Sequence, residues 1–179
     1  MCTANINRSV MAEALLGARI ARDRTDGNRV GQVASAGLLQ PNEPASSGAL
    51  AAMANRSLDL TKHRSRRLSP ELVQVADLIL TMERRHLREA AVMALGALAK
   101  TYTLKEFVRL GLEQPRRQPD EPLAALLARL DESRDHGALL SDDVADEVAD
   151  PVGGTSEDFE RTAEELDLLI AGVVWLLWP

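Results

Sequence analysis

The sequence predicts an α/β fold with a parallel sheet, and two features of the chain lead to this prediction. Short apolar runs of the kind found in buried parallel strands alternate with helical segments, most clearly at 76–82. A long amphipathic helix begins at Ser156 and continues almost to the end of the chain. The chain has 179 residues, 45% hydrophobic and 27% charged, enough for one sizeable core. We expect a single domain over 1–179, with a connecting excursion at 111–149.

The first third of the chain is expected to contain two helices and one short strand. Apolar residues recur at helical spacing over 9–22, and the polar segment 23–28 ends that helix. Residues 32–36 form a strand candidate that Gly37 closes. The alanine-rich segment 46–55 is then expected to be helical.

The rest of the chain continues the alternation of helices and strands. Ser69 is suited to cap a short helix, with Pro70 in its first turn. We expect a strand within 76–82, a helix over 83–98 and a short strand at 101–103. Two further helices are expected, one at 123–130 and one from Ser156 onward. The last helix has one apolar stripe, formed by Phe159, Ala163, Leu166, Ile170, Val173 and Leu177.

Composition and charge exclude several classes of protein. A net charge of −6 argues against a nucleic-acid binder, which normally shows a basic surplus. The single cysteine excludes an internal disulfide. The apolar stretch at 168–179 is too short to span a membrane, and no signal peptide is visible. We therefore expect a soluble cytoplasmic protein with neither a nucleic acid nor a membrane as its partner.

The first nine residues contain the pattern most suggestive of chemistry. Five residues separate Cys2 from Arg8, and a helix begins at once. Successive backbone N–H groups that lead into a helix N-terminus bind anions, and the same field stabilises a thiolate. An arginine can hold two phosphate oxygens, and Ser9 could donate a hydrogen bond to the sulfur. The pattern suits hydrolysis of a phosphate monoester; alone, it also fits a buried cysteine beside a helix-capping serine.

Several segments in the right order resemble one family of enzymes. The run from Cys2 to Leu16 closely resembles the opening of low-molecular-weight protein tyrosine phosphatases. Four later segments also resemble that family: Ser35-Ala36-Gly37, His63 to Leu68, Ala76 to Glu83, and Asp150-Pro151 with Gly153. The resemblance implies a three-layer α/β sandwich with a small parallel sheet, in which the strand before the cysteine is central.

The resemblance also implies a role for each matching residue. Cys2 would be the nucleophile that forms a phosphocysteine, and Arg8 would bind the phosphate. Asp150 would protonate the leaving group and then activate water. The phosphate-binding loop would comprise Thr3, Ala4, Asn5, Ile6, Asn7 and Ser9, with Ser35 and His63 in the hydrogen-bond network that supports it. No metal or organic cofactor is implied. The implied partner is a phosphotyrosine-containing protein, with a cognate bacterial tyrosine kinase as a further candidate.

The sequence departs from the family pattern at three positions. Asn7 replaces a second cysteine, so we expect Cys2 to lack protection by a disulfide and to oxidise further under peroxide. Val10 replaces a proline at the start of the helix, at a small cost in stability. Only Met1 precedes Cys2, so the central first strand is missing from this chain. We expect the natural chain to begin upstream, with the given chain an N-terminal truncation that folds poorly and has little activity.

Two other functions remain open at this point. One is an inactive or decaying phosphatase-like protein that is retained for binding. The other is arsenate reduction, which normally uses further cysteines that this chain does not have. Leu39 and Val152 are expected to give the substrate pocket shallow, aliphatic walls.

Other residues that could bind metals are expected to be structural or solvated. His86 and His136 show no metal-binding spacing, and neither does the acidic cluster in the excursion. This cluster comprises Asp142, Asp143, Asp146 and Glu147.

Overall fold

The computed structural model describes residues 1–22, 31–141 and 144–178 of this chain. The predicted loop at 23–28 therefore lies outside the described residues. The α-helices are α1 (Arg8–Arg22), α2 (Ser47–Ala54), α3 (Pro70–Val75), α4 (Arg84–Ala91), α5 (Leu104–Leu112), α6 (Leu123–Glu132) and α7 (Ser156–Leu177). The strands are β1 (Ile79–Thr81) and β2 (Thr101–Thr103), and the short 3₁₀ helices are η2 (Leu98–Lys100) and η3 (Ala138–Leu140).

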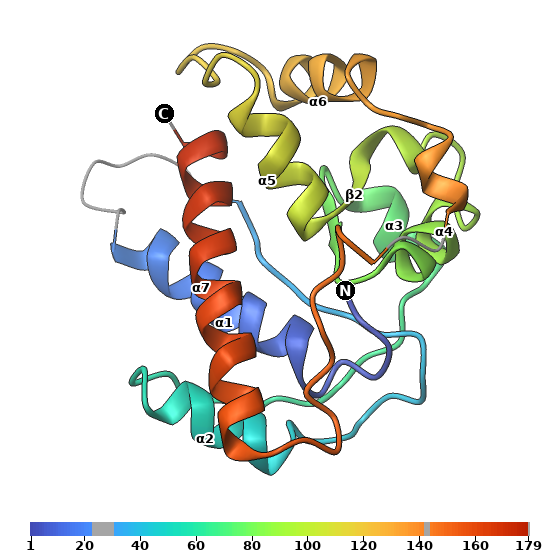
Figure 1. Ribbon diagram of the computed structural model, residues 1–179. Coiled ribbons are helices and arrows are strands. Elements are labelled where there is room, and N and C mark those ends of the chain that lie inside the picture. Colours follow the sequence, from blue (N-terminus) through green and yellow to red (C-terminus); the bar gives the residue numbers. More distant parts are fainter. Residues whose placement is uncertain (23–30, 142–143, 179) are drawn as a thin grey trace.

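The centre of the fold is a small parallel sheet, as predicted. β1 and β2 pair in parallel, with Leu80 opposite Tyr102. Isolated parallel bridges join Gly37 to Cys2 and to Arg67. Met1 lies beside β1, because its carbonyl accepts a hydrogen bond of 3.0 Å from the Met82 N–H. Cys2 therefore lies between the Gly37 segment and β1, and Figure 1 shows the N-terminus in the middle of the molecule beside β2.

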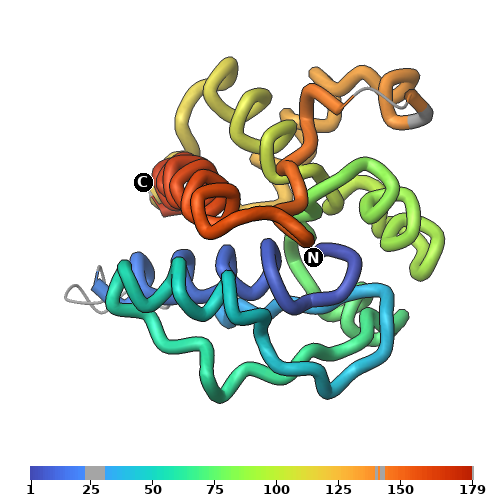
Figure 2. The backbone as a smooth tube through the Cα atoms, turned by 60° about the horizontal axis from the view of Figure 1, so that its bottom comes forward, coloured from blue at the N-terminus to red at the C-terminus, as the bar shows by residue number. Residues whose placement is uncertain are grey.

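Helices cover the strands on both sides and complete a three-layer α/β fold. α1, α2 and α7 lie on one side of the strands, whereas α3 and α4 lie on the other (Figure 1). Figure 2 shows α1 and α2 side by side, with α7 lying across them. The six apolar residues predicted for the last helix are all buried in the core, which confirms its stripe. No helix in the described part of the chain has the length and apolar character to cross a membrane.

Two expectations about secondary structure were wrong, and one helix was missed. Residues 32–36 form no strand, because a strand needs a continuous ladder and the neighbouring segments form bridges only with Gly37. The helix expected over 83–98 ends at Ala91, and Gly96 adopts a left-handed conformation with φ of 75°. α5 was not predicted, although Thr103 and Glu106 form a capping box at its start.

Candidate active site

The segment between Cys2 and Arg8 forms a loop whose carbonyl groups point outward. The Thr3 carbonyl accepts hydrogen bonds from the N–H groups of Leu38 and Leu39, at 2.7 and 3.1 Å. The Ile6 carbonyl accepts one of 3.0 Å from the Ser46 N–H. Within the described chain, the backbone N–H groups of residues 3–7 donate to no protein acceptor. These donors are therefore available to an anion in front of α1.

The nucleophile candidate lies at the base of this loop. Cys2 is buried, and its Sγ is 3.0 Å from the Ser9 hydroxyl oxygen. The same hydroxyl accepts a hydrogen bond of 2.9 Å from the Asn5 amide, so its own proton is free to point toward the sulfur. A hydroxyl that donates to the sulfur stabilises a thiolate relative to a thiol.

Asn5 holds the loop in an unusual backbone conformation. Its φ is 58°, which is uncommon for a residue other than glycine. Its side-chain amide also donates to the Ser35 hydroxyl at 2.7 Å, and its side-chain oxygen accepts from the Arg66 N–H at 3.0 Å. The Asn5 backbone carbonyl lies 2.7 Å from Nε2 of His63. The structure thus brings the predicted network residues together, and these contacts compensate for the strained conformation.

Two residues that support the loop were not predicted. The Ser35 hydroxyl donates to the Glu13 carboxylate at 2.5 Å, which extends the network to a charged group on α1. Gly37 lies so close to the loop that a Cβ there would be 2.7 Å from the Thr3 carbonyl oxygen and 2.8 Å from the Asn5 nitrogen. Glu13 could have been found from its place four residues after Ser9, on the same face of the helix.

Arg8 and Asp150 meet across the site. The Arg8 side chain is buried, and its Nη2 lies 2.5 Å from Oδ2 of Asp150. Its Nη1 contacts the Val148 carbonyl at 2.8 Å and the Glu83 carboxylate at 2.6 Å. Oδ1 of Asp150 accepts from the Val152 N–H at 3.2 Å, which orients the carboxylate. The structure therefore places a carboxylate, a buried guanidinium and a thiol around one loop.

The beginning of α4 also contacts this loop. The Thr3 hydroxyl lies 2.9 Å from Nε2 of His86 and 2.7 Å from Nη2 of Arg85. His86 was expected to be structural, but it touches the loop and is fully buried. Its burial lowers its pKa from 6.5 to about 3; the Glu83 carboxylate opposes this shift, and the Arg8 and Arg85 cations add to it. His86 is therefore neutral at ordinary pH.

A hollow of about 530 Å³ adjoins the loop. Its lining is mainly aliphatic and comprises Ala4, Ile6, Leu38, Leu39, Gln40, Glu43 and Arg67. Leu39 therefore lies where an aliphatic wall was expected. Val152 is not in this lining; its side chain is exposed near Asp150.

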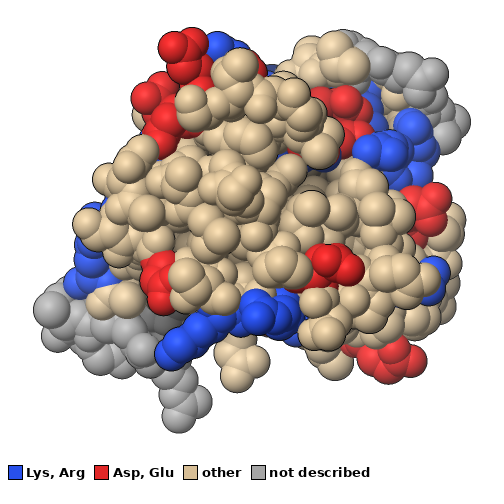
Figure 3. All heavy atoms as spheres, turned by 90° about the horizontal axis from the view of Figure 1, so that it is seen from below, with Lys and Arg blue, Asp and Glu red and all other residues tan. Residues whose placement is uncertain are grey.

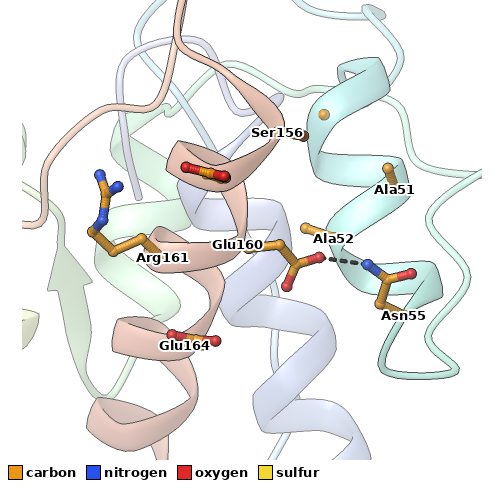
Figure 4. Close-up of a pocket in the computed structure, with 9 residues that line it drawn as sticks. Ala51, Ala52, Asn55, Ser156, Glu160, Arg161 and Glu164 are labelled. Carbon is orange, nitrogen blue, oxygen red and sulfur yellow. Dashed lines mark hydrogen bonds between the residues drawn. The ribbon is translucent and has the colours of Figure 1, made fainter.

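A second hollow, of about 460 Å³, lies between α2 and α7 and is lined by none of the predicted site residues. Figure 4 shows Glu160 in this hollow pointing toward Asn55, to which it is hydrogen-bonded at 2.6 Å.

On the face seen in Figure 3, small groups of basic and acidic side chains are separated by neutral residues.

The acidic cluster of the excursion is not simply a solvated loop. Asp142 and Asp143 lie outside the described residues. Asp146 is buried and pairs with Arg84 at 3.1 Å and with Arg109 at 3.0 Å. The expectation of a solvated carboxylate was therefore wrong for Asp146, because these two arginines compensate for its burial. In the described part of the chain, no group of three His, Cys, Asp or Glu side chains is placed to hold a metal ion.

Comparison with known proteins points to one family. The sequence model described as "Low molecular weight phosphotyrosine protein phosphatase" matches residues 1–136. A protein-arginine-phosphatase from Bacillus subtilis is 30% identical over 171 residues, which is 95% of this chain and 89% of that protein. The low molecular weight protein-tyrosine-phosphatase Etp from Escherichia coli is 35% identical over 101 residues, covering 56% of this chain and 64% of that protein.

Solved structures of phosphatases also superimpose on this chain. A low molecular weight protein tyrosine phosphatase from T. tengcongensis superimposes with a TM-score of 0.70 at 28% identity, covering 97% of this chain and 93% of that one. An arginine phosphatase from Geobacillus stearothermophilus superimposes with a TM-score of 0.67 at 25% identity, covering 96% of this chain and 86% of that one.

Proposed function

This chain belongs to the low molecular weight phosphotyrosine protein phosphatase family, and from that premise we propose that it hydrolyses phosphotyrosine in proteins. Membership makes it a phosphatase, and a phosphocysteine intermediate is general for the family. The observation that carries the proposal is the arrangement of Cys2, Arg8 and Asp150 around a loop whose N–H groups are available to an anion. This arrangement favours an active enzyme over a phosphatase-like binding protein.

In the first step, the Cys2 thiolate attacks phosphorus, and the S–P bond forms as the P–O bond to tyrosine breaks. The N–H groups of residues 3–7 and the Arg8 guanidinium hold the phosphoryl oxygens and stabilise their charge in the transition state. Protonated Asp150 donates its proton to the leaving phenolate oxygen. Asp150 lies beside Arg8, so it is on the same side of the site as the phosphate-binding group.

In the second step, a water molecule attacks the phosphocysteine. The Asp150 carboxylate accepts a proton from that water, and the S–P bond breaks to release inorganic phosphate. The Ser9 hydroxyl, 3.0 Å from Sγ, donates to the sulfur as it leaves as a thiolate. Cys2 and Asp150 thus act in both steps, and the enzyme returns to its starting protonation state.

Phosphoarginine in proteins is the second candidate substrate. The arginine phosphatase of Bacillus subtilis matches 95% of this chain, whereas Etp matches 56%. The hollow beside the loop also contains Glu43, whose carboxylate has no hydrogen-bond or ion-pair partner among the described residues. A carboxylate there could accept hydrogen bonds from the guanidinium of a phosphoarginine. The aliphatic Ala4, Ile6, Leu38 and Leu39 favour an aromatic ring instead.

Two peptides of identical sequence, one with phosphotyrosine and one with phosphoarginine, test this choice. We expect a higher kcat/KM of phosphate release at neutral pH for the phosphotyrosine peptide, and no release by the Cys2→Ser variant. A preference for the phosphoarginine peptide that Glu43→Gln reduces would establish the second candidate. Hydrolysis of p-nitrophenyl phosphate without hydrolysis of either peptide would contradict a protein substrate.

The proposal includes the setting of the enzyme. We place the enzyme in the cytoplasm of a bacterium, with a cognate tyrosine kinase as its partner. The chain forms one domain over 1–179, with a variable excursion at 111–149. Bacterial sources of the similar proteins support this setting. Fractionation of the producing cell, with phosphatase activity followed in each fraction, tests the location.

A further inference from the structure

We infer that Glu83 is a positioning residue, which turns one edge of the Arg8 guanidinium toward the phosphoryl group. Glu83 occupies the N-cap position of α4 without a side-chain capping hydrogen bond, and its side chain is largely buried. Its Oε1 lies 2.6 Å from Nη1 of Arg8. This inference deepens the proposed function, and rests on it, because it concerns how Arg8 meets a phosphate.

The contacts of Arg8 are divided between its two sides. Nη1 is occupied by the Glu83 carboxylate and by the Val148 carbonyl at 2.8 Å. Nε is buried and has no hydrogen-bond partner among the described residues. A buried donor that lacks a partner is costly unless a ligand satisfies it. Among the described residues, Nη2 contacts Asp150 alone, and the proposed reaction requires Asp150 to act on the leaving group.

The planarity of the guanidinium makes these contacts informative. Nε, Nη1 and Nη2 lie in one plane, so fixing Nη1 from the side also fixes the direction of the Nε–Nη2 edge. That edge is one of those that can hold two phosphate oxygens at once. Glu83 and Val148 together therefore direct this edge toward the phosphoryl group, which meets the free Nε and takes the place of Asp150 at Nη2.

Arg85 compensates for the negative charge that Glu83 places near the phosphoryl group. A carboxylate close to a phosphate dianion is repelled unless a cation compensates for its charge. Arg85 donates to the Glu83 carboxylate through Nε and lies 2.7 Å from the Thr3 hydroxyl. Burial alone would raise the pKa of Glu83, but the hydrogen bonds from Arg85 and Arg8 outweigh it and hold this pKa below its usual value. Glu83 is therefore ionised while the enzyme works.

The test compares Glu83→Gln with Glu89→Gln, an exposed position on the same helix. The measurements are the inhibition constant of inorganic phosphate and the kcat for p-nitrophenyl phosphate. We expect Glu83→Gln to weaken phosphate binding about tenfold, the size of one charge-assisted hydrogen bond, whereas Glu89→Gln leaves it unchanged. Equal phosphate binding by the wild-type protein and Glu83→Gln would overturn the inference.

A double-mutant cycle separates positioning from a general effect on folding. Lysine has no Nη1, so in an Arg8→Lys background Glu83→Gln should change phosphate affinity less than about twofold, measured by calorimetry. An undiminished tenfold effect in that background would show that Glu83 does not act through Arg8. If Glu83→Gln does not fold, Arg85→Gln is measured in its place. Arg85→Gln removes the hydrogen bond that holds the Glu83 carboxylate and leaves Arg8 itself unchanged, so it should weaken phosphate binding. Unchanged phosphate affinity in Arg85→Gln would also contradict the inference.

The outcomes distinguish this inference from the proposed function. If the wild-type protein hydrolyses phosphotyrosine peptides and Glu83→Gln has the same activity and phosphate affinity, the role of Glu83 is refuted and the proposed function stands. If the wild-type protein hydrolyses no phosphate monoester but binds phosphate more tightly than Glu83→Gln does, the proposed function is refuted and the role of Glu83 stands.

Discussion

Gly37→Ala should damage the site without removing any group that takes part in the chemistry. A Cβ at Gly37 would lie 2.7 Å from the Thr3 oxygen and 2.8 Å from the Asn5 nitrogen, and both are backbone atoms. Backbone cannot rotate away as the end of a side chain does, so either the loop or the Gly37 segment must shift. Gly37 is not among the residues with positive φ, so the cost comes from crowding and not from backbone strain.

The expected size of the effect follows from these contacts. Overpacking of this kind costs about 1–3 kcal/mol. A shift of Gly37 also weakens two hydrogen bonds, from its own N–H to the Arg66 carbonyl and from the Leu68 N–H to its carbonyl, each contributing about 1 kcal/mol. We predict a loss of about 2–3 kcal/mol in the free energy of unfolding, and at least a tenfold loss in kcat/KM because the loop N–H groups are displaced.

Urea unfolding and p-nitrophenyl phosphate hydrolysis measure the two effects. Gly17→Ala is the matched control, because a Cβ there meets no atom within 4 Å. Gly17 lies inside α1, so alanine should raise the free energy of unfolding by about 0.5–1 kcal/mol and leave kcat/KM unchanged. A Gly37→Ala variant with wild-type stability and wild-type kcat/KM would refute this account of the loop.

Three further predictions concern single side chains. Ser9→Ala should lower kcat about tenfold or more, since the thiolate loses one hydrogen bond; unchanged kcat in stopped-flow assays would argue against that contact. His86 has a folded pKa of about 3, below its unfolded value of 6.5, so its contribution to stability is full above pH 6.5. The free energy of unfolding should fall by up to about 1.4 kcal/mol per pH unit between pH 6.5 and 3, and urea titrations of His86→Gln should lack this part of the slope. Peroxide should inactivate the enzyme irreversibly, because Asn7 replaces the protecting cysteine; full recovery of activity with dithiothreitol would contradict this.

The parts of the fold that could be predicted are those with a regular local pattern. The stripe on α7 and the cap formed by Ser69 depend on residues close together in the sequence, and both were predicted correctly. The strand expected at 32–36 failed because strand formation depends on a ladder with distant segments, which no local pattern records. α5 had a signal in Thr103 and Glu106 that was overlooked.

The residues of the candidate site that the sequence predicted are those that match the family's motifs, and the structure brings them together. Their catalytic roles stay predictions until measured. Glu83 and Gly37 were not predicted as site residues, because each contacts the loop from a segment distant in sequence. Glu83 could have been suspected, since it lies two residues after the end of β1 and the carboxyl ends of parallel strands are where α/β folds bind ligands.

The nucleophilic role of Cys2 is the central claim, and one measurement tests it most directly. The protein is mixed rapidly with p-nitrophenyl phosphate, quenched in alkaline denaturant and digested, and the peptide that contains Cys2 is examined by mass spectrometry. We expect a phosphoryl group on Cys2 in the wild-type protein, and neither this label nor turnover in Cys2→Ala. Turnover by Cys2→Ala at the wild-type rate, or a phosphoryl group on another residue, would contradict it.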